Sequence, residues 1–217
     1  MSGLLLLGHR GARATRSILE NTLASFDLAL SHGCDGFEFD VRRTADGRSL
    51  VCHDPKIHGV DIALAGPAQL TDLPTLAQVL TRYQDRAFLD IEVKVAGMEQ
   101  AVLESLRLHP PRRGCFVSSF LPEVLHTLRA LRPDVPLGLL AETPSQLAAW
   151  PAVPGEFVLP HYTLIDINVC NQLRSAGKKI VVWTVNGWER MLRCRHMRVD
   201  GIISDETEIL GKLNAAG

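Results

Sequence analysis

Short apolar segments alternate with amphipathic segments along almost the whole chain of 217 residues. The apolar segments have the length typical of buried β-strands, and the segments between them carry apolar residues at helical spacing. The expected strands cover residues 4–7, 36–41, 87–94, 115–119, 136–140, 157–160, 179–185 and 201–204. Each is followed by an expected helix, at residues 23–30, 76–83, 99–108, 122–131, 145–150, 166–176, 188–195 and 206–213. Eight such units in a chain of this length predict an α/β fold, a TIM (β/α)8 barrel.

The runner-up architecture is an open, doubly wound parallel sheet, which alternating strands and helices also permit. Its dinucleotide-binding version needs a G-x-G-x-x-G fingerprint at the first turn between strand and helix. That turn reads Gly8-His9-Arg10-Gly11 here, which counts against this version. Because no linker or low-complexity segment divides the sequence, we expect a single domain over residues 1–217.

The second expected strand continues into a β-hairpin. Asp46-Gly47 is a strong turn signal, and a strand-like segment follows it directly. The return arm must be antiparallel, because a parallel neighbour needs a crossover of about a dozen residues. If Thr44 pairs near Ser49, counting back along the two arms places His53 beside Asp40.

Three carboxylates occupy strand positions that should face the interior. Glu38 and Asp40 alternate with two phenylalanines and a valine, and Glu92 lies near the end of the third strand. A buried carboxylate is costly unless a cation compensates its charge. Carboxylate oxygens are the ligands that Mg²⁺ and Ca²⁺ prefer, whereas zinc more often recruits histidine or cysteine. The sequence therefore predicts a site for one divalent metal ion, Mg²⁺ or Ca²⁺.

Basic side chains are expected at the same end of the barrel. His9 and Arg10 end the first strand, Lys94 ends the third, and the hairpin brings His53 back to them. In TIM barrels the carboxyl ends of the strands form the functional face. Arginine and lysine suit a phosphate, and two histidines can act as general acid and general base. With a metal ion, these groups predict cleavage of a phosphodiester.

Seven motifs follow one another along residues 8–206. They are His9-Arg10-Gly11, Glu20-Asn21-Thr22, Glu38-Phe39-Asp40, His53-Asp54, Ile91-Glu92-Val93-Lys94, Trp183-Thr184 and Gly201-Ile202-Ile203-Ser204-Asp205. In this order they resemble the glycerophosphodiester phosphodiesterase family. The resemblance implies a barrel of the phospholipase C-like phosphodiesterase type, with a β-hairpin extension after the second strand. It implies an enzyme that hydrolyses glycerophosphodiesters to sn-glycerol 3-phosphate and an alcohol, by way of a cyclic phosphate.

The resemblance also implies roles for individual residues. The acid/base pair would be His9 and His53, the metal ligands Glu38, Asp40 and Glu92, and the phosphate-binding groups Arg10 and Lys94. Trp183 either packs in the core or forms a wall against the glycerol carbons. Supporting roles are expected for four residues. Glu20 braces a loop or hydrogen-bonds a group that contacts the ligand, and Asn21 caps the first helix. Asp205 braces His9, with binding of a substrate hydroxyl as the alternative, and Asp54 adjoins His53.

Two segments depart from the family pattern. The loop from His9 to Glu20 is about two residues longer than usual, and Leu19 stands where the family commonly has proline. The same loop carries Arg13 and Arg16, which could contact an anionic headgroup. The insertion after the hairpin, about residues 54–74, is short and predicts an open mouth to the site.

Composition and charge limit the classes of partner that the chain is expected to bind. A net charge of −1 and a pI near 6.7 give no electrostatic case for nucleic acid or for an acidic membrane. The five cysteines lack metal-ligand spacing and are expected to be reduced and buried in a cytoplasmic protein. The apolar run at residues 4–7 is too short for a signal sequence or a membrane span. We expect a small-molecule partner and no stable membrane anchor, and the sequence carries no signal for an oligomeric state.

Two alternatives to the glycerophosphodiester activity stay open. A lysophospholipase D or phospholipase C-like enzyme would use the same site on a lipid, although no membrane-docking segment is evident. A non-catalytic phosphate-binding barrel would keep the cations without needing acid/base groups. The presence of both His9 and His53 counts against this second alternative.

Overall fold

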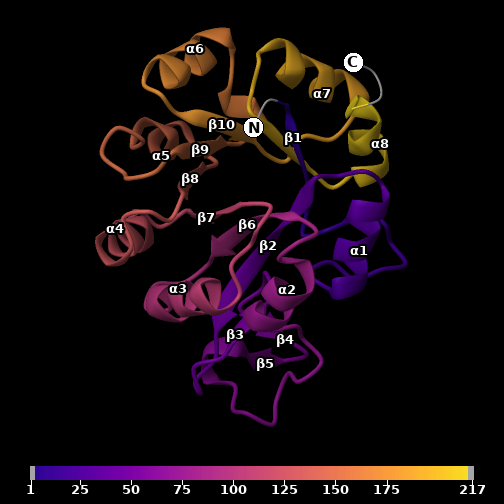
Figure 1. The fold of residues 1–217 in the computed structure, drawn as a ribbon, viewed down its shortest axis with the longest axis vertical. Coiled ribbons are helices and arrows are strands. Elements are labelled where there is room, and N and C mark those ends of the chain that lie inside the picture. Colours follow the sequence, from indigo (N-terminus) through magenta and orange to yellow (C-terminus); the bar gives the residue numbers. More distant parts are fainter. Residues whose placement is uncertain (1–2, 215–217) are drawn as a thin grey trace.

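Eight parallel strands close into a barrel in the computed structural model, which describes residues 3–214 (Figure 1). They are β1 (Leu5–His9), β2 (Gly36–Arg43), β6 (Phe88–Val93), β7 (Cys115–Ser119), β8 (Leu137–Ala141), β9 (Phe157–Pro160), β10 (Lys179–Val182) and β11 (Gly201–Ser204). Neighbours in this order pair along the barrel, and β1 pairs with both β2 and β11, which closes it. The predicted TIM barrel is confirmed.

A helix follows each barrel strand and covers the outside of the barrel (Figure 1). The helices are α1 (Leu23–Ser31), α2 (Leu76–Tyr83), α3 (Glu99–Leu108), α4 (Pro122–Leu131), α5 (Pro144–Ala148), α6 (Ile167–Ser175), α7 (Trp188–His196) and α8 (Thr207–Gly211). Short 3-10 turns add η1 (Ile62–Leu64), η2 (Tyr162–Leu164) and η3 (Lys212–Asn214). Within residues 3–214, no helix combines the length and the apolar character that crossing a membrane requires.

The start of α1 differs from expectation. Thr22, and not Asn21, is its N-cap, because the Thr22 hydroxyl accepts a hydrogen bond from the backbone N–H of Ser25 at 3.2 Å. Asn21 has a φ of +57° and turns its side chain inward, where Nδ2 donates to Asp40 Oδ2 at 2.8 Å. The predicted capping role of Asn21 is therefore wrong, and the residue instead braces a carboxylate.

The hairpin register also differs, by one residue. Strand β3 (Ser49–Val51) pairs antiparallel with β2, and Thr44 N–H donates to the carbonyl of Arg48 at 3.0 Å. A three-residue loop thus joins the arms and ends at Gly47, whose φ of +87° suits glycine. Asp40 consequently lies across from Cys52, and His53 follows one position beyond the expected pairing.

The segment between β3 and α2 contains structure that the sequence did not indicate. Strands β4 (Lys56–Ile57) and β5 (Val60–Asp61) form a small antiparallel pair, and η1 follows them. Ile62 and Leu70 pack beneath them against Leu50. In Figure 1 this extension lies beside α2 at one end of the molecule.

The packing of β2 explains why its carboxylates face inward. Phe37 and Phe39 point outward into a cluster with Phe26 of α1 and Tyr83 of α2, and the Phe26 and Phe37 rings stack at 4.1 Å. Side chains in a strand alternate between its faces, so the residues between these phenylalanines point to the barrel interior. The outer aromatic core thereby fixes Glu38 in the interior. The cysteines are free thiols, four of them buried.

Candidate active site

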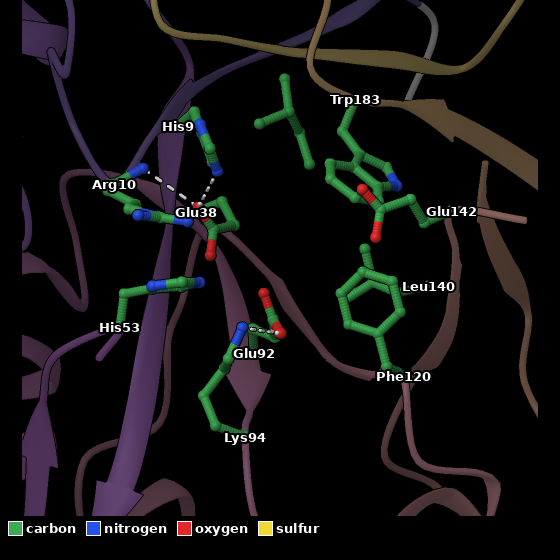
Figure 2. Close-up of a pocket in the computed structure, with 11 residues that line it drawn as sticks. His9, Arg10, Glu38, His53, Glu92, Lys94, Phe120, Leu140, Glu142 and Trp183 are labelled. Carbon is green, nitrogen blue, oxygen red and sulfur yellow. Dashed lines mark hydrogen bonds and ion pairs between the residues drawn. The ribbon is translucent and has the colours of Figure 1, made fainter. Parts of the chain in front are cut away.

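Strand register gathers polar side chains at the carboxyl end of the barrel. His9 lies beside Glu38 across β1 and β2, and Asp40 lies beside Glu92 across β2 and β6. A cavity of about 300 Å³ opens above them (Figure 2). Seven predicted site residues line it: His9, Arg10, Glu38, His53, Glu92, Lys94 and Trp183. Asp40 is fully buried at its base, and the four supporting residues lie outside its lining.

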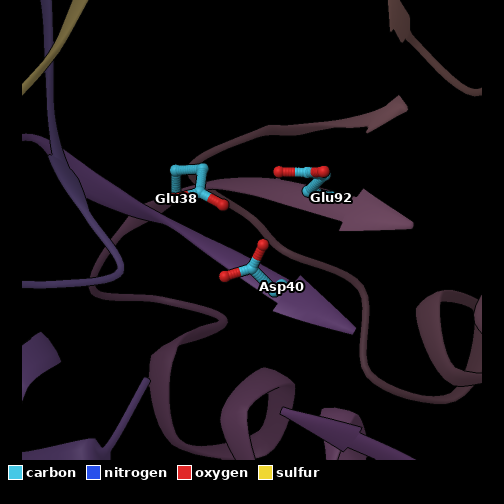
Figure 3. Close-up of side chains that lie close together, drawn as sticks. All are labelled: Glu38, Asp40 and Glu92. Carbon is cyan, nitrogen blue, oxygen red and sulfur yellow. The ribbon is translucent and has the colours of Figure 1, made fainter. Parts of the chain in front are cut away.

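The three carboxylates of Glu38, Asp40 and Glu92 form a compact, buried cluster (Figure 3). Each contributes an oxygen, and these oxygens lie within 4.8 Å of one another. Burial raises the pKa of Glu92 to about 7, with a further contribution from Asp40. Burial and the neighbouring carboxylates also hold the pKa of Glu38 well above its usual range. Without a bound cation, Glu38 and Glu92 are therefore protonated more readily than ordinary carboxyl groups, and a cation would favour their ionised forms.

Arg10 and Lys94 supply part of the missing positive charge. Lys94 Nζ lies 2.6 Å from Glu92 Oε1 and 3.3 Å from Asp40 Oδ1, and Arg10 Nε lies 3.2 Å from Asp40 Oδ2. Burial acts to raise the pKa of Asp40, but Lys94 and Arg10 outweigh it and lower that pKa. Asp40 is thus the carboxylate of the cluster that the protein itself keeps ionised.

The residues of the cluster fit a hard divalent cation. Among residues 3–214, no donor hydrogen-bonds to Glu38 Oε1 or Asp40 Oδ1, although both oxygens are buried, and Asp40 Oδ1 has only its ion pair with Lys94. A buried acceptor without a donor is costly, and a bound cation would compensate it. The ligand set is all oxygen, as Mg²⁺ and Ca²⁺ prefer.

His9 is held from behind by a carboxylate. Its Nδ1 lies 2.7 Å from Asp205 Oδ1, and its Nε2 lies 3.8 Å from Glu38 Oε2 and is directed into the cavity (Figure 2). Burial lowers the pKa of His9, against the opposing effect of Asp205. The imidazole is therefore held with Nδ1–H on Asp205 and with Nε2 free to exchange a proton.

Asp205 is fixed by contacts that the sequence did not reveal. Asn186 Nδ2 donates to its Oδ2 at 2.8 Å, and Arg13 reaches its Oδ1 at 3.2 Å. Burial acts to raise the pKa of Asp205, but the hydrogen bonds from His9 and Asn186 and the charge of Arg13 lower it strongly. The sequence prediction that Asp205 braces His9 agrees with this geometry.

His53 also lines the cavity, and it is paired with an aspartate as His9 is, but in a more exposed position. Its Nδ1 lies 2.8 Å from Asp54 Oδ1, and its backbone carbonyl accepts a hydrogen bond from Arg42 Nε at 2.6 Å. The hydrogen bond from His53 lowers the pKa of Asp54. His53 thus lines the cavity although Cys52, and not His53, lies across from Asp40.

The loop after β1 is braced by Glu20. Its carboxylate accepts hydrogen bonds from Arg10 at 2.7 Å and from Arg13 at 2.6 Å. Arg13 is thus engaged within the protein, and the suggestion that it contacts a headgroup is not supported by its position. Arg16 is exposed and is not among the residues that line the cavity.

The cavity wall opposite the carboxylates is largely apolar. Trp183 and Phe120 meet edge to face at 5.4 Å, and Trp183 Nε1 donates to the carbonyl of Leu159 at 2.7 Å. Trp183 is half-buried and lines the cavity, as the wall interpretation requires. Phe120 and Glu142 were missed, although each follows the end of a barrel strand, which is the position where functional residues are expected.

Comparison with known proteins assigns the family. The profile of the glycerophosphoryl diester phosphodiesterase family matches residues 9–75 and 65–209. The chain belongs to this family. It is accordingly an enzyme, a phosphodiesterase, as the sequence predicted.

Individual relatives agree over nearly the full length. The chain is 28% identical to a glycerophosphodiester phosphodiesterase of Caldanaerobacter subterraneus subsp. tengcongensis, over 98% of this chain and 98% of the relative. The crystal structure of a glycerophosphodiester phosphodiesterase from Thermotoga maritima superposes with a TM-score of 0.83 at 28% identity, covering 98% of this chain and 99% of that one. A phosphodiesterase of Oleispira antarctica, solved in complex with the product sn-glycerol-3-phosphate, has the same fold, with a TM-score of 0.84 at 23% identity and coverage of 98% and 96%.

Proposed function

We propose that the protein hydrolyses glycerophosphodiesters to sn-glycerol 3-phosphate and an alcohol. Family membership and the relatives that carry this activity in their names support the reaction. The product bound in the Oleispira antarctica structure supports a small-molecule substrate. The observation that carries the proposal is the cavity itself, where two histidines, two fixed cations and a carboxylate cluster meet.

Glu38, Asp40 and Glu92 would hold one divalent ion, Mg²⁺ or Ca²⁺. Their unbonded buried oxygens and the raised pKa values of Glu38 and Glu92 support this assignment. Such an ion would neutralise charge on the nonbridging oxygens of the phosphate.

Arg10 and Lys94 would bind the same phosphate from the protein side. Both line the cavity, and both are held in place by carboxylates: Arg10 by Glu20 and Asp40, and Lys94 by Glu92. Cations fixed in this way need no reorganisation when negative charge builds up on the phosphate.

His9 and His53 would transfer the protons. In each, the Nδ1–H directed at an aspartate leaves Nε2 to act on the substrate, one as general base and the other as general acid. The base would remove a proton from the attacking hydroxyl, and the acid would protonate the oxygen of the departing alcohol. Attack by a glycerol hydroxyl, with a cyclic phosphate as intermediate, is compatible with this arrangement.

Trp183 would face the glycerol carbons, consistent with its place in the apolar wall. We further propose that the chain acts as a single domain on dissolved diesters, and that it does so in the cytoplasm. The free, mostly buried cysteines support this location.

The direct test is release of glycerol 3-phosphate from glycerophosphocholine, glycerophosphoethanolamine and glycerophosphoglycerol, with Mg²⁺, Ca²⁺ or EDTA. We expect release with at least one metal and none with EDTA. Absence of release from every substrate with either metal would overturn the proposed function. Full activity in EDTA would overturn the metal assignment alone.

A further inference from the structure

The cavity has two chemically different halves. One half holds the histidines, the cations and the carboxylate cluster described above. The other half is lined by Phe120, Leu140, Trp183 and Ile203, together with a single acidic side chain, Glu142. Because Trp183 Nε1 already donates to the carbonyl of Leu159, the indole ring offers this half no free polar group. Glu142 is therefore the one polar side chain among the residues that line the apolar half.

Glu142 stands on a fixed backbone directly after β8. Its N–H donates to Gln146 Oε1 at 2.9 Å, and the same oxygen accepts from the Thr143 N–H at 3.0 Å. Pro144 begins α5 next to it and restricts the chain further. In Figure 2 the Glu142 carboxylate lies beside the Trp183 ring, across the cavity from His9 and Glu38. No hydrogen bond to this carboxylate is formed within residues 3–214, although the side chain is exposed to the cavity.

A carboxylate that accepts no hydrogen bond from the described residues, and whose charge acts on nearby His161, restricts what can bind here. A phosphate at Arg10 and Lys94 would direct the glycerol part of the substrate toward the apolar half. A carboxylate near an anionic diester is unfavourable unless the ligand brings a hydrogen-bond donor to it. Glycerol provides such donors, since two of its hydroxyls remain free in a fully deacylated diester. If one hydroxyl faces the reacting phosphate, the terminal hydroxyl is left to meet Glu142.

We propose that Glu142 is a specificity-determining residue that accepts a hydrogen bond from the free terminal hydroxyl of the glycerol moiety. This inference rests on the proposed function and names the residue that would restrict the site to diesters of unacylated glycerol. In a lysophospholipid the same oxygen is esterified, so it has no hydrogen to donate. The acyl chain would also lie against the carboxylate and remove it from water without a partner. Glu142 would thus discriminate against lysophospholipids.

The test compares four substrates: glycerophosphocholine, glycerophosphoglycerol, the propane-1,2-diol analogue of glycerophosphocholine without the terminal hydroxyl, and short-chain lysophosphatidylcholine below its micellar concentration. We expect Glu142→Leu to lower kcat/KM about 10–100-fold on glycerophosphocholine, the range for a hydrogen bond to a charged group. The same substitution should change kcat/KM on the analogue less than about 3-fold. It should raise kcat/KM on the lysophospholipid relative to that on glycerophosphocholine. Glu142→Gln, which keeps an uncharged acceptor, should fall between wild type and Glu142→Leu on glycerophosphocholine.

Glu123→Gln is the matched control, because Glu123 is exposed at the start of α4 and is not among the residues that line the cavity. It should leave kcat/KM on every one of these substrates unchanged, with thermal unfolding confirming that every variant folds. An equal loss on glycerophosphocholine and on the analogue, or no loss at all, would overturn the inference. So would a loss on glycerophosphocholine that is absent on glycerophosphoglycerol, which would mean that Glu142 contacts the choline ammonium. An inactive wild type would overturn the proposed function and this inference together, whereas an active wild type with unaltered ratios overturns the inference alone.

Discussion

The two histidines of the cavity have the same hydrogen-bond pattern in very different surroundings. His9 and its partner Asp205 have side chains only 12% and 14% exposed, whereas those of His53 and Asp54 are 34% and 67% exposed. The first pair belongs to the carboxyl ends of two adjacent barrel strands. The second pair lies on the segment that follows the hairpin.

This difference shows that the protein fixes the two imidazole groups of the cavity in two ways. On the buried side, side-chain contacts hold the imidazole, because water cannot replace them. On the exposed side, water can replace the Asp54 hydrogen bond, so the backbone must do more of the positioning. There the contact from Arg42 to the His53 carbonyl is the structural anchor. The two sides should therefore respond differently to equivalent substitutions.

Removal of either imidazole should have the largest effect on kcat, and the losses on the buried and the exposed side should be of similar size. We expect His9→Ala and His53→Ala each to reduce kcat by about 10²–10⁴-fold, since each removes an acid/base group. Steady-state release of glycerol 3-phosphate measures the loss. Metal affinity, followed by calorimetric titration, should remain nearly unchanged in both variants. Weakened metal binding in His53→Ala would make His53 a ligand instead.

Substitution of the two aspartates should lower kcat more on the buried side than on the exposed side. Asp205→Asn should lower kcat about 10–100-fold, because the amide can donate to Nδ1 and stabilise the imidazole tautomer with its proton on Nε2. Asp54→Asn should cost only a few-fold, because water reaches that pair. Asp27→Asn, at a surface pair with Arg82 on the outside of the barrel, is a suitable control. Equal losses at the two positions would contradict the distinction drawn from burial.

The barrel and most of the site followed from local patterns, and the errors have identifiable causes. The alternation around Glu38 and Asp40 correctly predicted inward-facing carboxylates, because the outer phenylalanines have only one face on which to pack. The hairpin register was wrong because glycine at a positive φ permits a three-residue loop that the turn signal alone does not specify. Asn21 was placed as a cap because asparagine and threonine are both favoured N-cap residues, and the sequence does not distinguish between these two neighbours.

Contacts between distant segments could not be predicted. Asn186 follows β10 and reaches Asp205 only because β10 and β11 are adjacent in the closed barrel. Its sequence context contains no pattern that announces this role. The Arg42 contact to His53 similarly depends on how the hairpin folds back.

The buried carboxylate cluster beside His9 should also make the stability of the protein depend on pH when metal is removed. The pKa of Glu92 is raised by burial from 4.5 to about 7, so the metal-free folded chain binds a proton that the unfolded chain releases between these values. Binding of this proton contributes up to about 3 kcal/mol to the free energy of unfolding. The contribution is fully present below about pH 4.5 and is lost as the pH rises through about 7. In EDTA, the melting temperature of wild type should fall by several degrees between pH 5 and pH 7.5 relative to that of Glu92→Gln, because the lowered pKa of His9 acts in the opposite direction in both proteins. Added Mg²⁺ or Ca²⁺ should restore it more at pH 7.5 than at pH 5.

Glu92→Gln provides the control for this dependence, because the amide does not titrate. It should remove the part of the melting-temperature profile that Glu92 causes, whereas Asp54→Asn, on the exposed side, should leave the profile as in wild type. Identical profiles for wild type and Glu92→Gln in EDTA would contradict the raised pKa of Glu92 as a cause of the pH dependence.

The smallest effects should come from the outer anchors of the two histidines. Arg42→Met removes the hydrogen bond to the His53 carbonyl and should lower kcat about 3–10-fold with KM little changed, because the loop, not the phosphate site, loses its anchor. Arg13→Met should cost less than about 3-fold, since Asp205 keeps its hydrogen bonds to His9 and Asn186. Arg43→Met is the matched control, because Arg43 donates to the Gly97 carbonyl and is not a lining residue of the cavity. If Arg13→Met proved the more damaging of the two, the buried pair would depend on its outer contact more than the exposed pair depends on its backbone anchor.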